Sequence, residues 1–283
     1  EHLDNTYIHG ESPAVKLLYL ETIQQPQKLL KHASSLIKKG CRIAAVKAGS
    51  SEAGSRAASS HTGAMASPDV AVDALFRKAG IVRCKSREEL ATVASIFMHK
   101  QLKGKRIAII THAGGPAVML TDALSDGGLE IPSLKEHHAS NALLSKLFPG
   151  SSIANPIDFL ATGTAEQLSS IIDTCENEYE NIDGMAVIFG SPGLFEVYDV
   201  YDILHEKMKT YKKPIYPILP SVMNVKDEIQ HFINKGNCYF PDEVLFGNAL
   251  SKIVKTPEPS CTNTTELPMI DSKAIRNIIN KSD

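Results

Sequence analysis

The sequence has no excess of either charge, no long apolar run and no paired cysteines. Its 283 residues carry 30 Lys and Arg against 32 Asp and Glu, a formal net charge of -2, which does not indicate a nucleic-acid-binding protein. No segment approaches the roughly 18 consecutive apolar residues of a membrane span. The first residues also lack the basic and apolar regions of a signal peptide. We therefore expect a cytoplasmic protein that contacts neither nucleic acid nor membrane.

Metal and nucleotide signatures are missing as well. The five cysteines are scattered without a C-x-x-C pair, so neither a disulfide framework nor a zinc site is predicted, and no metal ligand set is proposed. Neither a G-x-G-x-x-G fingerprint nor a Walker motif is present. We expect a nucleotide to need another domain.

Short apolar runs bounded by turn residues alternate with amphipathic stretches, a pattern typical of parallel sheets covered by helices on both faces. At about 150 residues per domain, the length suggests two such α/β domains, doubly wound around parallel sheets. Strands are expected at 15–20, 42–46, 81–83, 106–111, 130–131, 185–189, 215–219 and 238–240, and helices at 27–39, 69–79, 88–98, 117–124, 166–174, 197–210, 225–234 and 242–254.

We expect three segments, residues 1–102, 103–255 and 256–283, because a second unit of strand, glycine turn and helix begins near Gly104. The third segment starts with a linker rich in Pro and Thr and leads into the start of a helix. Since the chain begins at Glu1 and ends shortly after that helix begins, we expect it to be part of a longer protein. Residues 47–68 contain almost no large apolar side chain and are predicted to be a loop without a packed helix.

His61 lies in this small-residue loop, where an imidazole has little to pack against. A neutral imidazole is a good nucleophile near neutral pH, although a solvated loop histidine explains this residue equally simply. Glu21 directly follows an apolar strand, at the edge where α/β sheets bind ligands. Its carboxylate could fix the imidazole tautomer, or it could be an ordinary strand-end glutamate.

A strand, a glycine turn and a helix follow one another around Gly114 and Gly115, a geometry that offers backbone N–H groups to an anion. The same residues could simply connect a strand to a helix. His112 precedes the glycines, and Asn155 and Asp158 follow another apolar run, so all three are candidates for lining this sheet edge.

Four features together resemble the nucleoside-diphosphate-forming acyl-CoA synthetases, the superfamily that includes succinyl-CoA synthetase and ADP-forming acetyl-CoA synthetase. They are Glu21, KAGSSEAGSRAASSHTGAM (47–65), THAGGPAVM (111–119) and NPID (155–158). The resemblance covers nearly the whole chain. It implies two flavodoxin-like CoA-ligase domains, with a CoA-binding domain before Glu1 and an ATP-grasp domain after the last helix, in the same full-length chain.

The resemblance also implies the roles of individual residues. His61 matches the family's phosphorylated histidine, and Glu21 matches the glutamate that steadies it. Phosphate contacts are expected from the rest of the SHTG segment and from the glycine turn, namely Ser60, Thr62, Gly63, Gly114, Gly115 and Ala117. Pro116 has no N–H to offer.

The implied reaction interconverts acyl-CoA, phosphate and a nucleoside diphosphate with carboxylate, CoA and a nucleoside triphosphate, through an acyl phosphate and a phosphohistidine. CoA and ADP or ATP with Mg²⁺ are expected in the full-length enzyme, and only phosphate or sulfate in this fragment, which we expect to be inactive for the full reaction. A homodimer is a possible assembly.

Two other functions remain open from the sequence. One is a regulatory acyltransferase or CoA-sensing module of the same architecture, and the other is a non-catalytic flavodoxin-like interaction module, since a fold does not fix a function. The retention of His61 argues against the first.

Overall fold

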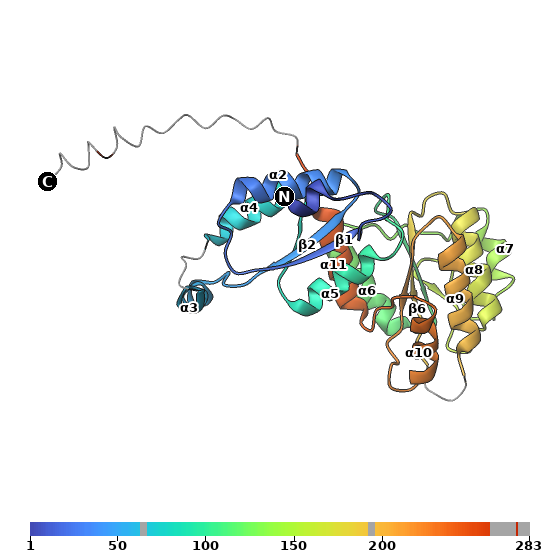
Figure 1. The fold of residues 1–283 in the computed structure, drawn as a ribbon. Coiled ribbons are helices and arrows are strands. Elements are labelled where there is room, and N and C mark those ends of the chain that lie inside the picture. The colour runs from blue at the N-terminus through green and yellow to red at the C-terminus, as the bar shows by residue number, and fades with distance from the viewer. Residues whose placement is uncertain (63–66, 192–195, 261–275, 277–283) are drawn as a thin grey trace.

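A computed structural model of the chain describes residues 1–62, 67–191, 196–260 and 276, without the side chains of His61 and Thr62. Two parallel sheets with flanking helices make up the described part, with α2 and α4 at one end of the molecule and α7, α8 and α9 at the other (Figure 1). In chain order the elements are α1 (His2–Asn5), β1 (Val15–Leu20), α2 (Pro26–Lys38), β2 (Arg42–Lys47), α3 (Glu52–Thr62), α4 (Asp69–Ala79), β3 (Val82–Cys84), α5 (Arg87–Phe97), β4 (Ile107–Thr111), α6 (Gly114–Asp126), α7 (Ser140–Leu144), β5 (Ile157–Asp158), α8 (Ala165–Asn177), β6 (Gly184–Ile188), α9 (Tyr198–Thr210), β7 (Ile215–Ile218), α10 (Lys226–Asn234) and α11 (Glu243–Lys255).

The first sheet has three parallel strands in the order β1-β2-β3. Successive side chains of β2 point to opposite faces. Ile43 and Ala45 pack with α2 and α4 in one core, whereas Ala44 and Val46 face a second core that contains α5. Because β2 is buried on both faces, it appears in the sequence as a continuous apolar run.

The second sheet has the order β5-β4-β6-β7, and all its strands are parallel. A bridge between Ile218 and Phe240 adds a fifth position beside β7. The resulting order, 2-1-3-4-5, is that of flavodoxin-like sheets. Helices α7 to α10 cover one face, and α6 and α11 cover the other. The predicted α/β fold with doubly wound parallel sheets is confirmed.

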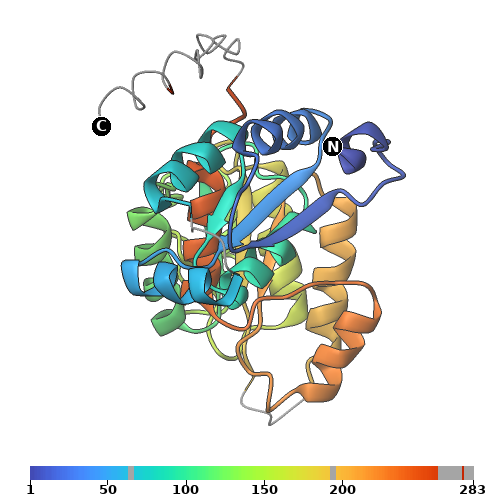
Figure 2. The same ribbon diagram turned by 60° about the vertical axis from the view of Figure 1, so that its left-hand side comes forward.

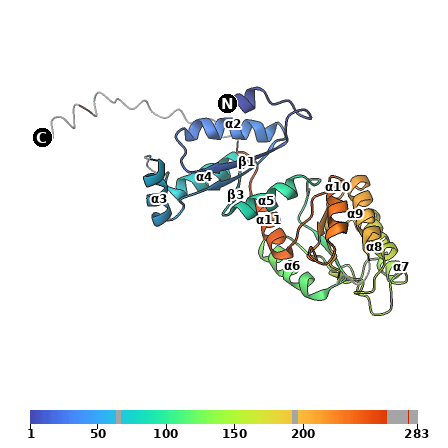
Figure 3. The same ribbon diagram turned by 60° about the horizontal axis from the view of Figure 1, so that its bottom comes forward.

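One hydrophobic core joins the two sheets through α5 and α11. Val46 of β2, Val93 of α5, Ile109 of β4 and Phe246 of α11 belong to the same cluster of buried side chains. In Figure 3, α5 and α11 lie between the first sheet and the rest of the second unit. The division between residues 102 and 103 stays a prediction, and any such division runs through a shared core.

The start of the predicted linker, 256–283, packs against the first unit. Pro259 is buried, and the backbone N–H of Ser260 donates to the carbonyl of Lys78 on α4 at 3.3 Å. Gly80 ends α4 in the left-handed conformation and lies against Pro259. A Cβ on Gly80 would be only 2.9 Å from Pro259 Cδ. Residues 257–260 therefore pack back on α4, and 261–275 and 277–283 lie outside the described residues.

The prediction of a loop over 47–68 is wrong for residues 52–62, which form helix α3. Local interactions account for it. Ser51 Oγ accepts a hydrogen bond from Gly54 N at 3.1 Å, Glu52 pairs with Arg56 at 2.7 Å, and alanines with high helix propensity follow. None of the side chains that the structure describes in α3 is buried, so the helix gains little from packing. Figure 2 shows it, in light blue, standing apart from α2.

Candidate active site

Glu21 and Lys47 lie together at the carboxyl edge of the first sheet. Leu20 pairs with Lys47 in the parallel register of β1 and β2, and Ala48 N donates to Leu20 O at 2.8 Å. Glu21 is the next residue after β1 and is half-buried. The two strand ends thus hold a carboxylate and an ammonium as neighbours at the edge where parallel sheets bind ligands.

The segment that carries His61 leaves and returns at the same edge. α3 begins a few residues after Lys47, and His61 is its penultimate residue. On the other side of residues 63–66, which include Gly63 and lie outside the described residues, Ser67 Oγ accepts a hydrogen bond from Ile23 N at 3.3 Å. Five extended residues span at most about 18 Å, so the end of α3 is within that distance of the segment beginning at Glu21.

The structure gives Ser60 and Thr62 positions on the last turn of α3. Ser60 is exposed, and no side-chain contact is described for Thr62 or His61. The phosphate contacts predicted for Ser60 and Thr62 therefore stay predictions.

The glycine turn opens α6, which begins at Gly114, three residues earlier than expected. Thr111 Oγ1 accepts from Ala113 N at 3.0 Å and donates to Ala113 O at 2.8 Å, which fixes the turn after β4. The cap residue, Ala113, offers no side chain to the first-turn amides. Gly114 and Gly115 are exposed, and as the first two residues of α6 they carry N–H groups without an intrahelical partner at the positive end of the helix dipole.

Ala117 contributes to packing at this turn. Its side chain is 1% exposed and belongs to the shared core. As the fourth residue of α6, it has the first N–H that an α-helix pairs internally, so the free amides belong to the two glycines.

Asp158 lies beside this turn, whereas Asn155 does not. β5 pairs with β4 so that Asp158 is opposite Thr111, and its Oδ2 would be 3.8 Å from a Cβ on Gly114. The Asn155 amide instead accepts from Ile109 N at 2.9 Å and donates to two backbone carbonyls, those of Ile107 and Pro132, at 3.0 Å each. Asn155 thereby ties its loop to β4 and has no free group for a ligand.

His112 lines a small hollow at the carboxyl ends of β4, β6 and β7. The hollow measures about 260 Å³ and is bordered by Pro116, Gly190 and Ser221. The His112 ring stacks on Phe189 at 4.5 Å, and its buried Nδ1 has no hydrogen-bond partner among the described residues. Burial lowers the pKa of His112, so the ring is neutral at physiological pH. It could act there as a neutral hydrogen-bonding group.

The two candidate groups are separate in this conformation. In Figures 1 and 3, α5 and α11 lie between α3, which carries His61, and α6, which begins at Gly114. The structure therefore groups Glu21 with the His61 segment, and His112 and Asp158 with the glycine turn. The two groups do not meet across one cleft.

Lys47 is a candidate that the sequence analysis missed. It is only 5% exposed, and its Nζ donates to Gly49 O at 2.5 Å. A buried lysine at a strand end is unusual, because lysines are almost never fully buried without a partner. The sequence signal was a charged residue closing the apolar run RIAAV at the ligand edge of a sheet.

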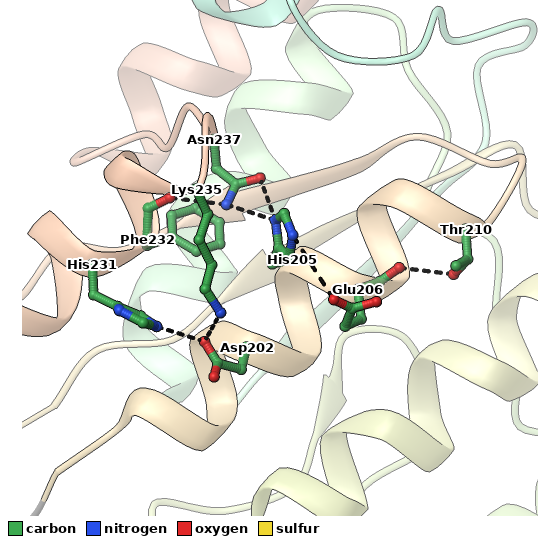
Figure 4. A network of polar contacts seen from close by, with 8 residues as sticks. All are labelled: Asp202, His205, Glu206, Thr210, His231, Phe232, Lys235 and Asn237. Atoms are coloured by element: carbon green, nitrogen blue, oxygen red, sulfur yellow. Dashed lines mark hydrogen bonds and ion pairs between the residues drawn. The ribbon is translucent and has the colours of Figure 1, made fainter.

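Another polar cluster, between α9 and α10, has its groups paired with one another, and His205, Lys235 and Asn237 of this cluster line a hollow of about 420 Å³. Asp202 Oδ1 accepts from His231 Nε2 at 2.9 Å and from Lys235 Nζ at 2.6 Å, and the His205 ring bonds to Asn237 (Figure 4). This cluster joins two helices. Within the described ranges, no group of three or more His, Cys, Asp or Glu side chains could hold a metal ion, and no helix is long and apolar enough to cross a membrane.

Comparison with known proteins supports the resemblance. Residues 7–97 match the family model described as the succinyl-CoA ligase like flavodoxin domain. The alpha subunit of ADP-forming acetate–CoA ligase II from Pyrococcus furiosus is 36% identical over 149 residues, which are 53% of this chain and 32% of that protein. The alpha subunit of ligase I from the same organism is 27% identical over 251 residues, 87% of this chain and 53% of that protein.

A solved structure shares the fold. It is an acetyl-coenzyme A synthetase from Candidatus Korarchaeum cryptofilum in complex with phosphate and ADP, with a TM-score of 0.76 and 23% identity over 86% of this chain and 53% of that chain. The matched part of this chain spans about half or less of these relatives. Residues 7–97 therefore match a succinyl-CoA ligase like flavodoxin domain, and the chain is similar to ADP-forming acyl-CoA ligases over part of their length.

Proposed function

We propose that this chain is the CoA-ligase part of an enzyme that makes a nucleoside triphosphate from an acyl-CoA, phosphate and a nucleoside diphosphate, with His61 as the phosphoryl carrier. The relatives named above are ADP-forming ligases, which supports this class of reaction. The observation that carries the proposal is local. The His61 segment is tied at both ends to the sheet edge that holds Glu21.

The reaction has three transfers. A phosphate oxygen attacks the thioester carbonyl, the C–S bond breaks, and the CoA thiolate leaves and takes a proton. An imidazole nitrogen of His61 then attacks phosphorus in the acyl phosphate, and the carboxylate leaves. Finally a terminal oxygen of the nucleoside diphosphate attacks the phosphohistidine, the P–N bond breaks, and the neutral imidazole is restored.

Glu21 is proposed to orient His61. Its carboxylate would accept the Nδ1 hydrogen of the imidazole, which leaves Nε2 free to attack. As the imidazole gains a bond to phosphorus it becomes positive, and the carboxylate would stabilise that charge. Glu21 is available for this role, since the described residues include no ion pair or hydrogen bond to its side chain.

The first turn of α6 is proposed as a phosphate cradle. Two free N–H groups and the helix dipole stabilise an anion without a formal charge, so a phosphoryl group can bind and leave. Because α3 and α6 lie apart, the His61 segment would have to move, or the two groups would serve different steps. The family resemblance implies that Mg²⁺ would be held with the nucleotide in another domain.

Phosphorylation of His61 can be tested directly in the full-length protein. We expect incubation with labelled ATP and Mg²⁺ to give an acid-labile, alkali-stable phosphoprotein that is absent in His61→Ala. The matched control is His138→Ala, whose side chain is 72% exposed and far along the chain from α3, and which should label like the wild type. Labelling of His61→Ala at the wild-type level would contradict the proposal.

The role of Glu21 has its own readout. Glu21→Gln keeps the size of the side chain but removes the charge, so we expect slower labelling and a shorter lifetime of the phosphoprotein. If both rate and lifetime equal those of the wild type, Glu21 does not orient His61.

A further inference from the structure

A basic hollow lies at the carboxyl ends of β2 and β3, between α4 and the C-terminal end of α11. It measures about 800 Å³. Among the residues that the structure describes, two acidic side chains, Asp69 and Asp73, line it. The basic side chains that line it are Lys47, Arg77, Arg83, Lys85, Lys252 and Lys255.

The acidic groups at this hollow are already paired. Arg83 bonds to Asp69 at 2.5 Å and to Asp73 at 3.2 Å. Lys252 forms an ion pair with Glu89 on α5. These pairs use the carboxylates that could have neutralised the remaining cations.

Four cations therefore remain without a carboxylate partner among the described residues, namely Lys47, Arg77, Lys85 and Lys255. Lys255 Nζ donates only to a backbone carbonyl, that of Asp126, at 3.2 Å. Like charges that share a hollow repel one another and raise the local concentration of anions. An anion that binds in the hollow would offset this repulsion and so lower the free energy of the protein.

Lys47 gives the hollow a built anchor. Its ammonium has three donors, and the one described acceptor is Gly49 O at 2.5 Å. A buried charge is costly unless an opposite charge and hydrogen bonds compensate it. At 5% exposure, Lys47 receives little compensation from water. An anion in the hollow would supply both the charge and the acceptors.

We propose that this hollow binds the diphosphate group of a ligand, with Lys47 as the buried anchor and Arg77, Lys85 and Lys255 around the rim. Lysine binds phosphate as a point charge. Several lysines together therefore suit a ligand with a diphosphate group better than a ligand with a single carboxylate. Ligand pockets of roughly 300–1,000 Å³ hold whole organic molecules, so the volume also admits a nucleoside part. This site goes beyond the phosphoryl transfer proposed for His61, because it uses none of the same residues.

Calorimetric titration of the chain with inorganic diphosphate, ADP and CoA, without added metal, tests the proposal. We expect saturable binding of one diphosphate-containing ligand per chain, weakened by salt. ADP or CoA binding at least tenfold tighter than inorganic diphosphate would assign an organic ligand. Equal affinities would assign inorganic diphosphate.

Variants locate the site. Lys47→Met keeps the apolar stem and should weaken binding at least tenfold. Should that variant unfold, the double variant Arg77→Gln/Lys85→Gln changes only exposed side chains and should weaken binding several-fold. Lys212→Gln removes one charge, as Lys47→Met does, but at an exposed position outside the hollow, and it should bind like the wild type.

His61→Ala should also bind diphosphate normally, which separates this proposal from the function of His61. The proposal is overturned if none of the three ligands binds saturably, or if the double variant binds as tightly as Lys212→Gln.

Discussion

Lys47 is paired with Leu20 across the parallel strands β1 and β2, which places a buried ammonium beside the residue that leads directly into Glu21. Opposite charges at neighbouring strand ends form a polar edge in a sheet whose central strand, β2, is buried in apolar contacts on both faces. The His61 segment starts and ends at this edge. The first sheet is thus the scaffold that positions the proposed phosphoryl carrier.

The amino end of α6 can be tested by occupying it with a side-chain anion. Gly115→Asp places a carboxylate where a phosphate would bind, and this should stabilise the protein by about 0.3–1 kcal/mol through the helix dipole. The same carboxylate should strongly reduce turnover by the full-length enzyme. Urea unfolding and a coupled ATP-formation assay provide the two measurements.

Gly115→Ala is the matched control for that experiment. A Cβ at position 115 meets no heavy atom within 4 Å, so the alanine variant should fold and keep its free N–H groups. Equal activity of the aspartate and alanine variants would show that this helix end binds no catalytic phosphate.

Helix α3 should be stable only locally. Ser51→Ala removes the hydrogen bond to Gly54 N, which costs about 1 kcal/mol of helix stability. Because no described side chain of α3 is buried, we expect the urea midpoint to stay unchanged while the α3 amides exchange faster with solvent.

The same change at Ser86 is the comparison. Ser86 Oγ accepts from Glu89 N at 3.1 Å at the start of α5, whose Val93, Ile96 and Phe97 are buried in the shared core. Ser86→Ala should therefore lower the free energy of global unfolding by about 1 kcal/mol. A larger global effect at Ser51 than at Ser86 would mean that α3 packs more tightly than described.

Asp183 should make the folded state sensitive to acid. Its carboxylate bonds to the Arg106 guanidinium at 2.7 Å and accepts from the backbone N–H groups of Lys105 and Arg106. The hydrogen bond with Arg106 is the main cause that holds the pKa of Asp183 below its usual value. Asp183→Asn should therefore destabilise the protein by about 2 kcal/mol at pH 7.

The sign of the pH dependence follows from the lowered pKa. Stabilisation by Asp183 is complete above its unfolded pKa of about 3.9 and is lost as the pH falls through the folded value. The gap between wild type and Asp183→Asn should thus close below about pH 4. Asp202→Asn is the control, since Lys235 lowers the pKa of Asp202 but its side chain is 46% exposed, and its loss should cost at most about 1 kcal/mol.

Cysteine reactivity should follow burial. Burial raises the pKa of Cys175 to about 12, so at pH 8 only about one thiol in ten thousand is ionised. Cys238 is partly exposed. Mass spectrometry after brief alkylation of the native protein should find Cys238 modified well before Cys175, and both modified equally after unfolding in guanidinium. Early modification of Cys175 would indicate local opening of α8.

Strands and helices with a clear apolar pattern could be predicted from the sequence. β1 and α4 have the predicted bounds, Val15–Leu20 and Asp69–Ala79, because a short apolar run of strand length and a helix buried on one face leave distinct patterns in the sequence. α3 was missed for the same reason, since a helix held by its cap, an ion pair and alanines needs no apolar stripe. Asn155 was expected to line the site only because it follows an apolar run in the sequence. The structure shows instead that its amide is hydrogen-bonded to β4.

By itself, the sequence determined the α/β class, the order of the elements with a clear apolar pattern, and the small set of polar residues at strand ends, because these depend on local periodicity and on turn residues. The tertiary structure alone decided that α5 and α11 share one core, that Lys47 is buried at the strand end paired with Leu20, and that the Gly114 turn lies apart from His61. These are relations between segments far apart in the chain. They depend on how whole faces pack, and no local pattern encodes that.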